Sequence, residues 1–130
     1  MVDKDPGQHA LDLAGDPAEL GRVRGWARAA LEDVPGVDPA LLADVVGALD
    51  ELASNAIRHG AAPRRVLLRH ANGALRVEVS DGSPVRAEYR APSTDGGRGL
   101  RMIEAYVDTW GQTEHDGGKT VWAEFALPPS

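Results

Sequence analysis

Cysteine is absent from the 130-residue sequence, lysine occurs only twice, and no apolar run approaches the length of a membrane span. Without cysteine the chain has neither a disulfide framework nor a thiolate metal site. The formal net charge of -6 argues against a surface that coats nucleic acid, because such surfaces are basic. The first ten residues are polar and do not resemble a secretory leader. We therefore expect a cytoplasmic protein that contacts neither a membrane nor nucleic acid directly.

The composition is otherwise that of an ordinary globular domain, with 42% apolar and 26% charged residues. A chain of 130 residues is long enough for one core and short for two independent cores. The sequence therefore predicts a single domain over residues 1–130, with a flexible tail over about residues 1–8.

Two segments carry the start signals of helices. Asp16 is a predicted N-cap, with Pro17 in the first turn and Glu19 three residues after the cap, which predicts a helix from about Pro17 to Glu32. Asp38 and a following proline open a second helix, which the sequence predicts to end near Gly60. Apolar residues recur every three or four positions in both segments, so each helix has one buried face.

The rest of the chain reads mainly as strands and loops. "RRVLLRH" and "ALRVEVSD" flank an Asn-Gly turn signal and predict a β-hairpin, and "TWGQTEHDGGKTVWAEFAL" predicts two more strands. Between them lie a predicted long loop over residues 82–97 and a helix over about 99–107. The pattern predicts an α+β fold, a two-layer α/β sandwich whose mostly antiparallel mixed sheet is covered on one face by helices.

The stretch "ELASNAIRHG" places polar side chains beside the buried stripe of the second helix. Glu51 and Asn55 lie roughly 40° apart on an ideal helical wheel, so they share one flank. A carboxylate there suits proton transfer, and a neutral amide oxygen suits Mg²⁺. Taken alone, these two positions are described equally well as a pair of solvated helix residues.

Two further segments have the chemistry of a nucleotide site. Asp81 stands where a strand ends, and its carboxylate suits the exocyclic amine of a base, although Asp-Gly is also a common turn. "DGGRGL" leads glycines directly into the start of a helix, which favours an anion site, although a plain loop-to-helix junction has the same appearance. Together these features make a complete nucleotide site: an acid and an amide on a helix, an aspartate at a strand end, a long loop, and glycines that open a helix.

This ordered set resembles the Bergerat ATP-binding fold of gyrase, chaperone ATPases, histidine kinases and mismatch-repair ATPases. It is most similar to the free-standing anti-sigma-factor serine kinases, over about residues 11–128. Their first motif, Glu-x-x-x-Asn-Ala followed by His-Gly, is matched by residues 51–60. The resemblance implies that Glu51 is the general base and that Asn55 binds ATP through Mg²⁺.

The resemblance assigns roles to residues beyond this first motif. It implies an adenine contact for Asp81 with Gly82, and places Thr120 close to the adenine and to Asp81. It implies a partner contact for Arg22, and homodimerisation by analogy with relatives. The second glycine motif, which contacts phosphates, is matched by Gly97, Arg98, Gly99 and Leu100.

The function that the resemblance implies is that of an ATP- and Mg²⁺-dependent serine/threonine kinase. It would phosphorylate a serine on a STAS-type anti-sigma-factor antagonist. In its other state it would bind and sequester a sigma factor. The family's Asp-x-Gly-x-Gly is altered here, because Ser83 and Val85 take the glycine positions. This alteration favours an alternative, a non-catalytic module that binds ATP as a conformational ligand.

Two alternative functions fit the sequence less well. The sensor half of a two-component kinase would need a dimerisation helix with a phosphorylated histidine before the domain. A structural domain that has lost nucleotide binding would have no reason to retain Glu51, Asn55 and Asp81 together.

Overall fold

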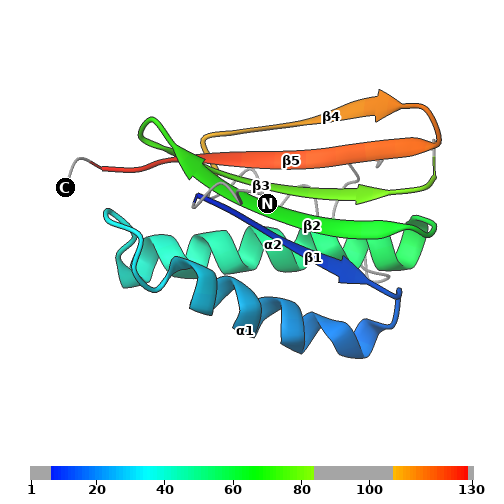
Figure 1. Cartoon of the computed structure of the whole chain (residues 1–130), viewed down its shortest axis with the longest axis horizontal. Coiled ribbons are helices and arrows are strands. Elements are labelled where there is room, and N and C mark those ends of the chain that lie inside the picture. The colour runs from blue at the N-terminus through cyan, green and yellow to red at the C-terminus, as the bar shows by residue number, and fades with distance from the viewer. Residues whose placement is uncertain (1–6, 84–106, 129–130) are drawn as a thin grey trace, which may run out of the picture.

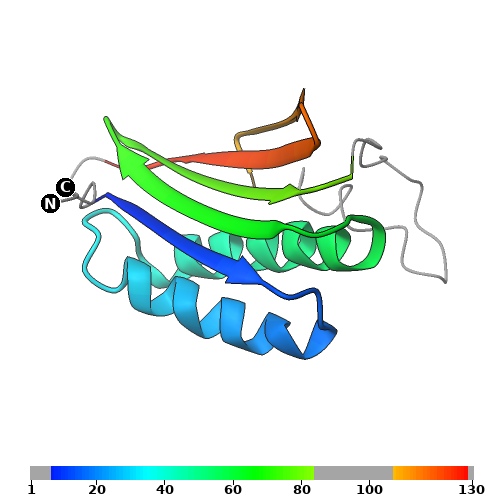
Figure 2. The same cartoon turned by 45° about the vertical axis from the view of Figure 1, so that its right-hand side comes forward.

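The computed structural model describes residues 7–83 and 107–128, which form a five-stranded sheet with helices on one face. Figures 1 and 2 show both long helices on the same side of the sheet, side by side. The elements in chain order are β1 (Gln8–Leu13), a short 3-10 helix (Pro17–Glu19), α1 (Leu20–Leu31), α2 (Pro39–His59), β2 (Arg64–Ala71), β3 (Ala74–Asp81), β4 (Thr109–His115) and β5 (Gly118–Ala126). The predicted α+β sandwich is confirmed.

The sheet has the strand order β1-β2-β3-β5-β4, and each of these four pairings is antiparallel. Strand β3 is therefore central, with its hairpin partner β2 on one side and β5 on the other. Helix α2 packs under β2, β3 and β5, and α1 packs against α2. The end of β3 thus comes to lie near the end of α2.

The predicted helix starts are confirmed at the level of single hydrogen bonds. The Asp16 side chain accepts from the backbone N–H of Ala18, and Glu19 completes the capping box. The chain then makes one turn of 3-10 helix before α1 begins, so the predicted helix is divided in two. Asp38 caps α2 by accepting from the N–H of Leu41 at 2.8 Å.

The first hairpin turn also follows from its sequence. Asn72 and Gly73 both have positive φ, 54° and 76°, which matches the twist of a two-residue hairpin. Asparagine and glycine adopt this conformation at lower cost than other residues. The turn fixes the register of β2 against β3, and hence which β3 side chains face the helices.

The core lies between the helix layer and one face of the sheet. On β3 every second residue is buried, and the series Leu75, Val77 and Val79 ends in Asp81. On β5 the buried series Val121, Ala123 and Phe125 is preceded by Lys119. Each fully buried apolar side chain contributes about 1.5–3 kcal/mol. Strand alternation therefore places an acid and a base at one end of an apolar layer.

No helix in the described ranges is long and apolar enough to cross a membrane.

Candidate nucleotide-binding site

The two flanks of α2 face different surroundings. Asp50 lies on the flank that faces α1, where its carboxylate accepts a hydrogen bond from Arg24 at 2.6 Å. A step of one residue turns a helix by about 100°, so Glu51 lies on the other side of the buried stripe. Asn55, one turn further along, shares that flank. The predicted acid and amide therefore lie on the side of α2 that faces away from α1.

The side chains of Glu51 and Asn55 are half-buried, and in the described part of the chain they make no hydrogen bond or ion pair. Burial raises the pKa of Glu51 above its ordinary value of 4.5; the negative charge of Asp50 adds to this, and Arg58 opposes it. A half-buried carboxylate with a raised pKa and an amide with unused hydrogen-bonding atoms are both available to a ligand.

Asp81 differs from Glu51 and Asn55, because its carboxylate is buried and its Oδ1 accepts two hydrogen bonds. Its Oδ2 lies 2.9 Å from Lys119 Nζ, and its Oδ1 accepts from the same ammonium at 3.1 Å. The backbone N–H of Ser83 also donates to Oδ1, at 2.8 Å. Both charged side chains are only 2% exposed. The ion pair fixes the orientation of the carboxylate that the sequence assigns to base recognition.

Gly60 brings Asp81 and α2 together. A Cβ added to Gly60 would lie 2.5 Å from Asp81 Cγ, so no other residue fits at this position without a shift. At a rise of about 1.5 Å per residue, Asn55 lies about 7 Å and Glu51 about 13 Å back along the helix from Gly60. The three predicted side chains therefore follow one another from the end of α2, in the order Asp81, Asn55, Glu51.

Arg64 holds the end of α2 in place. Its Nε donates to the carbonyl of Ala56 at 2.9 Å and its Nη2 to that of Gly60 at 3.2 Å. Both carbonyls lie at the C-terminus of α2, where a cation is favoured by the helix dipole, and that of Ala56 also accepts from the Gly60 N–H at 2.9 Å. Gly82 donates from its N–H to the Ala61 carbonyl at 2.7 Å, which joins the start of the loop after β3 to the same corner. The corner around Asp81 is therefore rigidly built.

The Thr120 side chain does not face Asp81, and its predicted place near the adenine stays a prediction. The Thr120 hydroxyl lies 2.8 Å from Ser80 Oγ and 3.1 Å from His115 Nε2, on the sheet face opposite the helices. Neighbouring residues in a strand point to opposite faces, so Lys119 takes the place expected for Thr120. Lys119 is the site residue that the sequence pattern did not single out. The alternation of "KTVWAEF", with Val121 and Phe125 inward, was the signal for it.

Several predicted residues lie outside the described ranges. These are the second glycine motif and the helix that it opens, together with Val85: Val85, Gly97, Arg98, Gly99 and Leu100. Their roles stay predictions from the sequence.

Arg22 lies on α1 and contacts none of the other predicted site residues among those that the structure describes. Its guanidinium donates to the Asp12 carbonyl at 3.0 Å and lies 3.7 Å from Glu19, yet the side chain is 58% exposed. These contacts tie α1 to β1 and leave much of the charge accessible. A partner contact for Arg22 stays a prediction.

A resident metal cluster is not found among residues 7–83 and 107–128, because no three acidic or histidine side chains converge there. The Asn55 amide oxygen is nevertheless a suitable single ligand for Mg²⁺, which usually retains several waters and binds together with substrate phosphates. The observed side chain fits this role, because its oxygen is not used by another described group.

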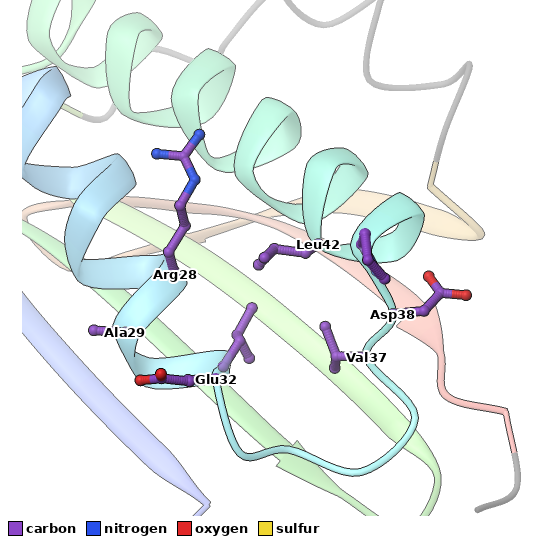
Figure 3. A pocket seen from close by; sticks show the side chains of 8 residues that line it. Arg28, Ala29, Glu32, Val37, Asp38 and Leu42 are labelled. Carbon is purple, nitrogen blue, oxygen red and sulfur yellow. The ribbon is translucent and has the colours of Figure 1, made fainter.

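A pocket of about 450 Å³ lies at the opposite end of α2 (Figure 3). It is lined by residues such as Arg28 of α1, Glu32 just after α1, Val37 just before α2 and Leu42 in the first part of α2. None of the predicted site residues lines it. The pocket is therefore separate from the Glu51, Asn55 and Asp81 series.

The fold is shared with known proteins. The crystal structure of the RsbU and RsbW domains of Rv1364c from Mycobacterium tuberculosis is 27% identical to this chain with a TM-score of 0.72. The match covers 95% of this chain and 33% of that one, so the chain spans about a third of the length of this relative.

Two histidine kinase structures share the fold at lower identity. The histidine kinase domain of the blue-light activated kinase EL346 from Erythrobacter litoralis has 20% identity and a TM-score of 0.54, over 85% of this chain and 60% of that one. The histidine kinase domain of the E. coli osmosensor EnvZ has 18% identity and a TM-score of 0.51, over 99% and 94%. At these identities the likeness concerns the fold alone.

No curated protein matches the sequence. The model of the histidine kinase-like ATPase domain matches residues 13–125, almost the whole chain. The predicted resemblance to the Bergerat ATP-binding domain of the anti-sigma-kinase type is confirmed by this match and by the likeness to the RsbU–RsbW structure. The chain belongs to the family of histidine kinase-like ATPase domains.

Proposed function

We propose that this chain is an ATP-binding regulatory protein of the anti-sigma-factor serine kinase type. One observation supports it most strongly: Glu51 and Asn55 are half-buried on one flank of α2, without partners in the described ranges, and this flank leads to the fixed carboxylate of Asp81. Membership of the ATPase family makes ATP the appropriate ligand. The base would lie at Asp81 and the phosphates would extend toward Asn55 and Glu51.

In this proposal Asn55 would hold Mg²⁺ on the phosphates, and the metal would supply charge stabilisation for the transferring phosphoryl group. Glu51 would accept the proton of the substrate serine as the serine oxygen forms its bond to the γ-phosphorus. The bond from the γ-phosphorus to the β–γ bridging oxygen breaks, and ADP leaves with that oxygen. The raised pKa of Glu51 suits this role, because a base works best when its pKa is near the operating pH.

The proposed substrate is a serine on a STAS-type anti-sigma-factor antagonist, and the proposed second partner is a sigma factor. The likeness to a structure that contains an RsbW domain supports a regulatory setting of this kind. Arg22 is the candidate for a partner contact, because its guanidinium is exposed on α1 and already oriented by Asp12. A homodimer is part of the same proposal.

A second candidate function is a module that binds ATP without transferring phosphate. It is favoured by Ser83, which replaces a glycine of the family pattern and whose backbone is held by Asp81 and Lys119. In this version nucleotide binding would change the affinity for a partner and no phosphate would move.

The two functions differ in a phosphotransfer experiment. Purified protein is incubated with γ-labelled Mg·ATP and a panel of STAS-domain proteins, and label on serine is measured. The kinase proposal expects transfer that Glu51→Gln reduces by at least about a hundredfold, within the range for general bases, while ATP still binds. Glu32→Gln makes the same chemical change at an exposed residue just after α1, and this matched control should retain transfer. Binding of ATP with no transfer to any candidate would favour the non-catalytic module.

A further inference from the structure

The buried pair of Asp81 and Lys119 calls for a reason beyond stability. The two residues are register partners on β3 and β5, and their neighbours along each strand's buried face are apolar. A buried ion pair loses so much hydration that an apolar pair of similar volume is often as stable or more stable. The pair lies at the site end of this layer, against Gly60 at the end of α2. Its position suggests a role in ligand recognition.

The hydrogen bonds around the pair leave one acceptor position open. Oδ1 of Asp81 accepts from Lys119 Nζ and from the Ser83 N–H, which uses both of its lone pairs. Oδ2 lies 2.9 Å from Lys119 Nζ in the ion pair and faces Gly60, and no described residue donates a hydrogen bond to it. The carboxylate cannot rotate without breaking these bonds. Asp81 therefore offers a ligand a single acceptor in a fixed direction.

The ammonium group is buried, and its contacts are with Asp81 and the segment that follows it. Nζ donates to Asp81 Oδ1 and, at 3.5 Å, to the Ser83 carbonyl, and it lies 2.9 Å from Asp81 Oδ2. A purine with a 6-amino group could donate to the open position on Oδ2. A purine with a 6-keto oxygen would instead place an acceptor against an acceptor. The pair therefore presents the chemistry that selects a 6-aminopurine.

We infer that Lys119 is a positioning residue for base recognition, which holds Asp81 so that its one open acceptor reads the 6-amino group of the nucleotide. This inference rests on the proposed ATP-binding function. Lys119 acts through Asp81, and its removal would let the carboxylate turn. The 6-amino group would then add little to the binding affinity, while contacts to the sugar and phosphates would be unchanged.

The test compares two ligands that differ only at the amine. ATP and purine riboside 5′-triphosphate, which lacks the 6-amino group, are titrated with Mg²⁺ into the full chain and into Lys119→Met. A hydrogen bond to a charged group corresponds to about a 10- to 150-fold preference, so the wild type should prefer ATP by a factor in this range. In Lys119→Met the preference should fall below about threefold. An unchanged preference, with both ligands weakened equally, would mean a purely structural role and overturn the inference.

A second measurement on the unaltered protein keeps the inference testable if Lys119→Met does not fold. The sequence contains only two lysines, Lys4 and Lys119, so the ¹⁵N resonance of the Lys119 ammonium is easily assigned. Saturating ATP should shift this resonance more than saturating purine riboside triphosphate does, because hydrogen bonds in a network polarise one another. Equal shifts with both ligands would overturn the inference. A wild-type protein that binds neither ligand would instead refute the proposed function itself.

Discussion

The two flanks of α2 place adjacent acidic residues in different surroundings. On the flank toward α1, Asp50 is paired with Arg24 at 2.6 Å, and the pair ties two helices together. On the other flank, Glu51 and Asn55 are half-buried without a partner in the described ranges, and the pKa of Glu51 is raised by burial. A partly buried carboxylate with a raised pKa and no protein partner is a candidate for contact with a ligand.

The largest effect is expected at the end of the site flank, where Asp81 is paired. Asp81→Ala would leave the Lys119 ammonium buried without its partner, which costs about 3–5 kcal/mol. Urea denaturation measures this loss. A loss below about 1 kcal/mol, the range of exposed ion pairs, would show that the pair is not held as tightly as its burial indicates.

A smaller effect is expected for Asn55→Ala, this time on binding. Removal of the amide oxygen should weaken Mg·ATP at least tenfold, about 1.4 kcal/mol, and abolish the dependence of affinity on Mg²⁺. Stability should change little, because the side chain makes no hydrogen bond within the described residues. Calorimetric titration with and without Mg²⁺ gives both quantities. Affinity that still responds to Mg²⁺ in the variant would remove Asn55 as the metal ligand.

On the α1 flank, Arg24→Ala should cost no more than about 1 kcal/mol in stability, since the two side chains are 41% and 31% exposed and the pair is screened by solvent. Urea denaturation measures this cost, and nucleotide affinity should be unchanged. The proposed difference between the flanks is contradicted if Arg24→Ala weakens ATP binding as much as Asn55→Ala does.

The smallest effect on stability is expected for Glu51→Gln, and its size depends on pH. Because the folded-state pKa of Glu51 is raised, its protonated form favours folding, and that contribution is fully present below about pH 4.5. It is lost as pH rises through the folded-state pKa. Glutamine does not titrate, so the variant should be more stable than the wild type at pH 7, by less than about 1 kcal/mol for a half-exposed group.

Paired denaturation curves at pH 4 and pH 7 test this pH dependence. The gain should be present at pH 7 and absent at pH 4. A gain of the same size at both values would mean that the effect does not come from the charge of Glu51.

Much of the fold could be predicted because its signals are local. Asp16 and Asp38 cap their helices with bonds to residues two or three positions away, and Asn72 with Gly73 forms a turn that depends on its own dihedral angles. The helical wheel likewise placed Glu51 and Asn55 on one flank, since the helix period alone determines this.

The residue beside Asp81 could not be predicted in the same way, because it depends on the pairing of β3 with β5 across some forty residues of chain. Strand alternation does place Lys119 and Asp81 on the core side of their strands. The register that pairs Asp81 with Lys119 is set by the tertiary structure and cannot be read from either strand alone. The resemblance to relatives placed Thr120, and not Lys119, close to Asp81. The second glycine motif lies outside the described residues and stays a prediction.

The central claim is that the Glu51, Asn55 and Asp81 series binds Mg·ATP, and calorimetric titration of Mg·ATP into the wild type and Asp81→Asn tests it most directly. We predict saturable binding to the wild type and its loss in Asp81→Asn, whose fold is checked by circular dichroism. If the wild type does not bind ATP, or if folded Asp81→Asn binds it equally well, the claim is contradicted.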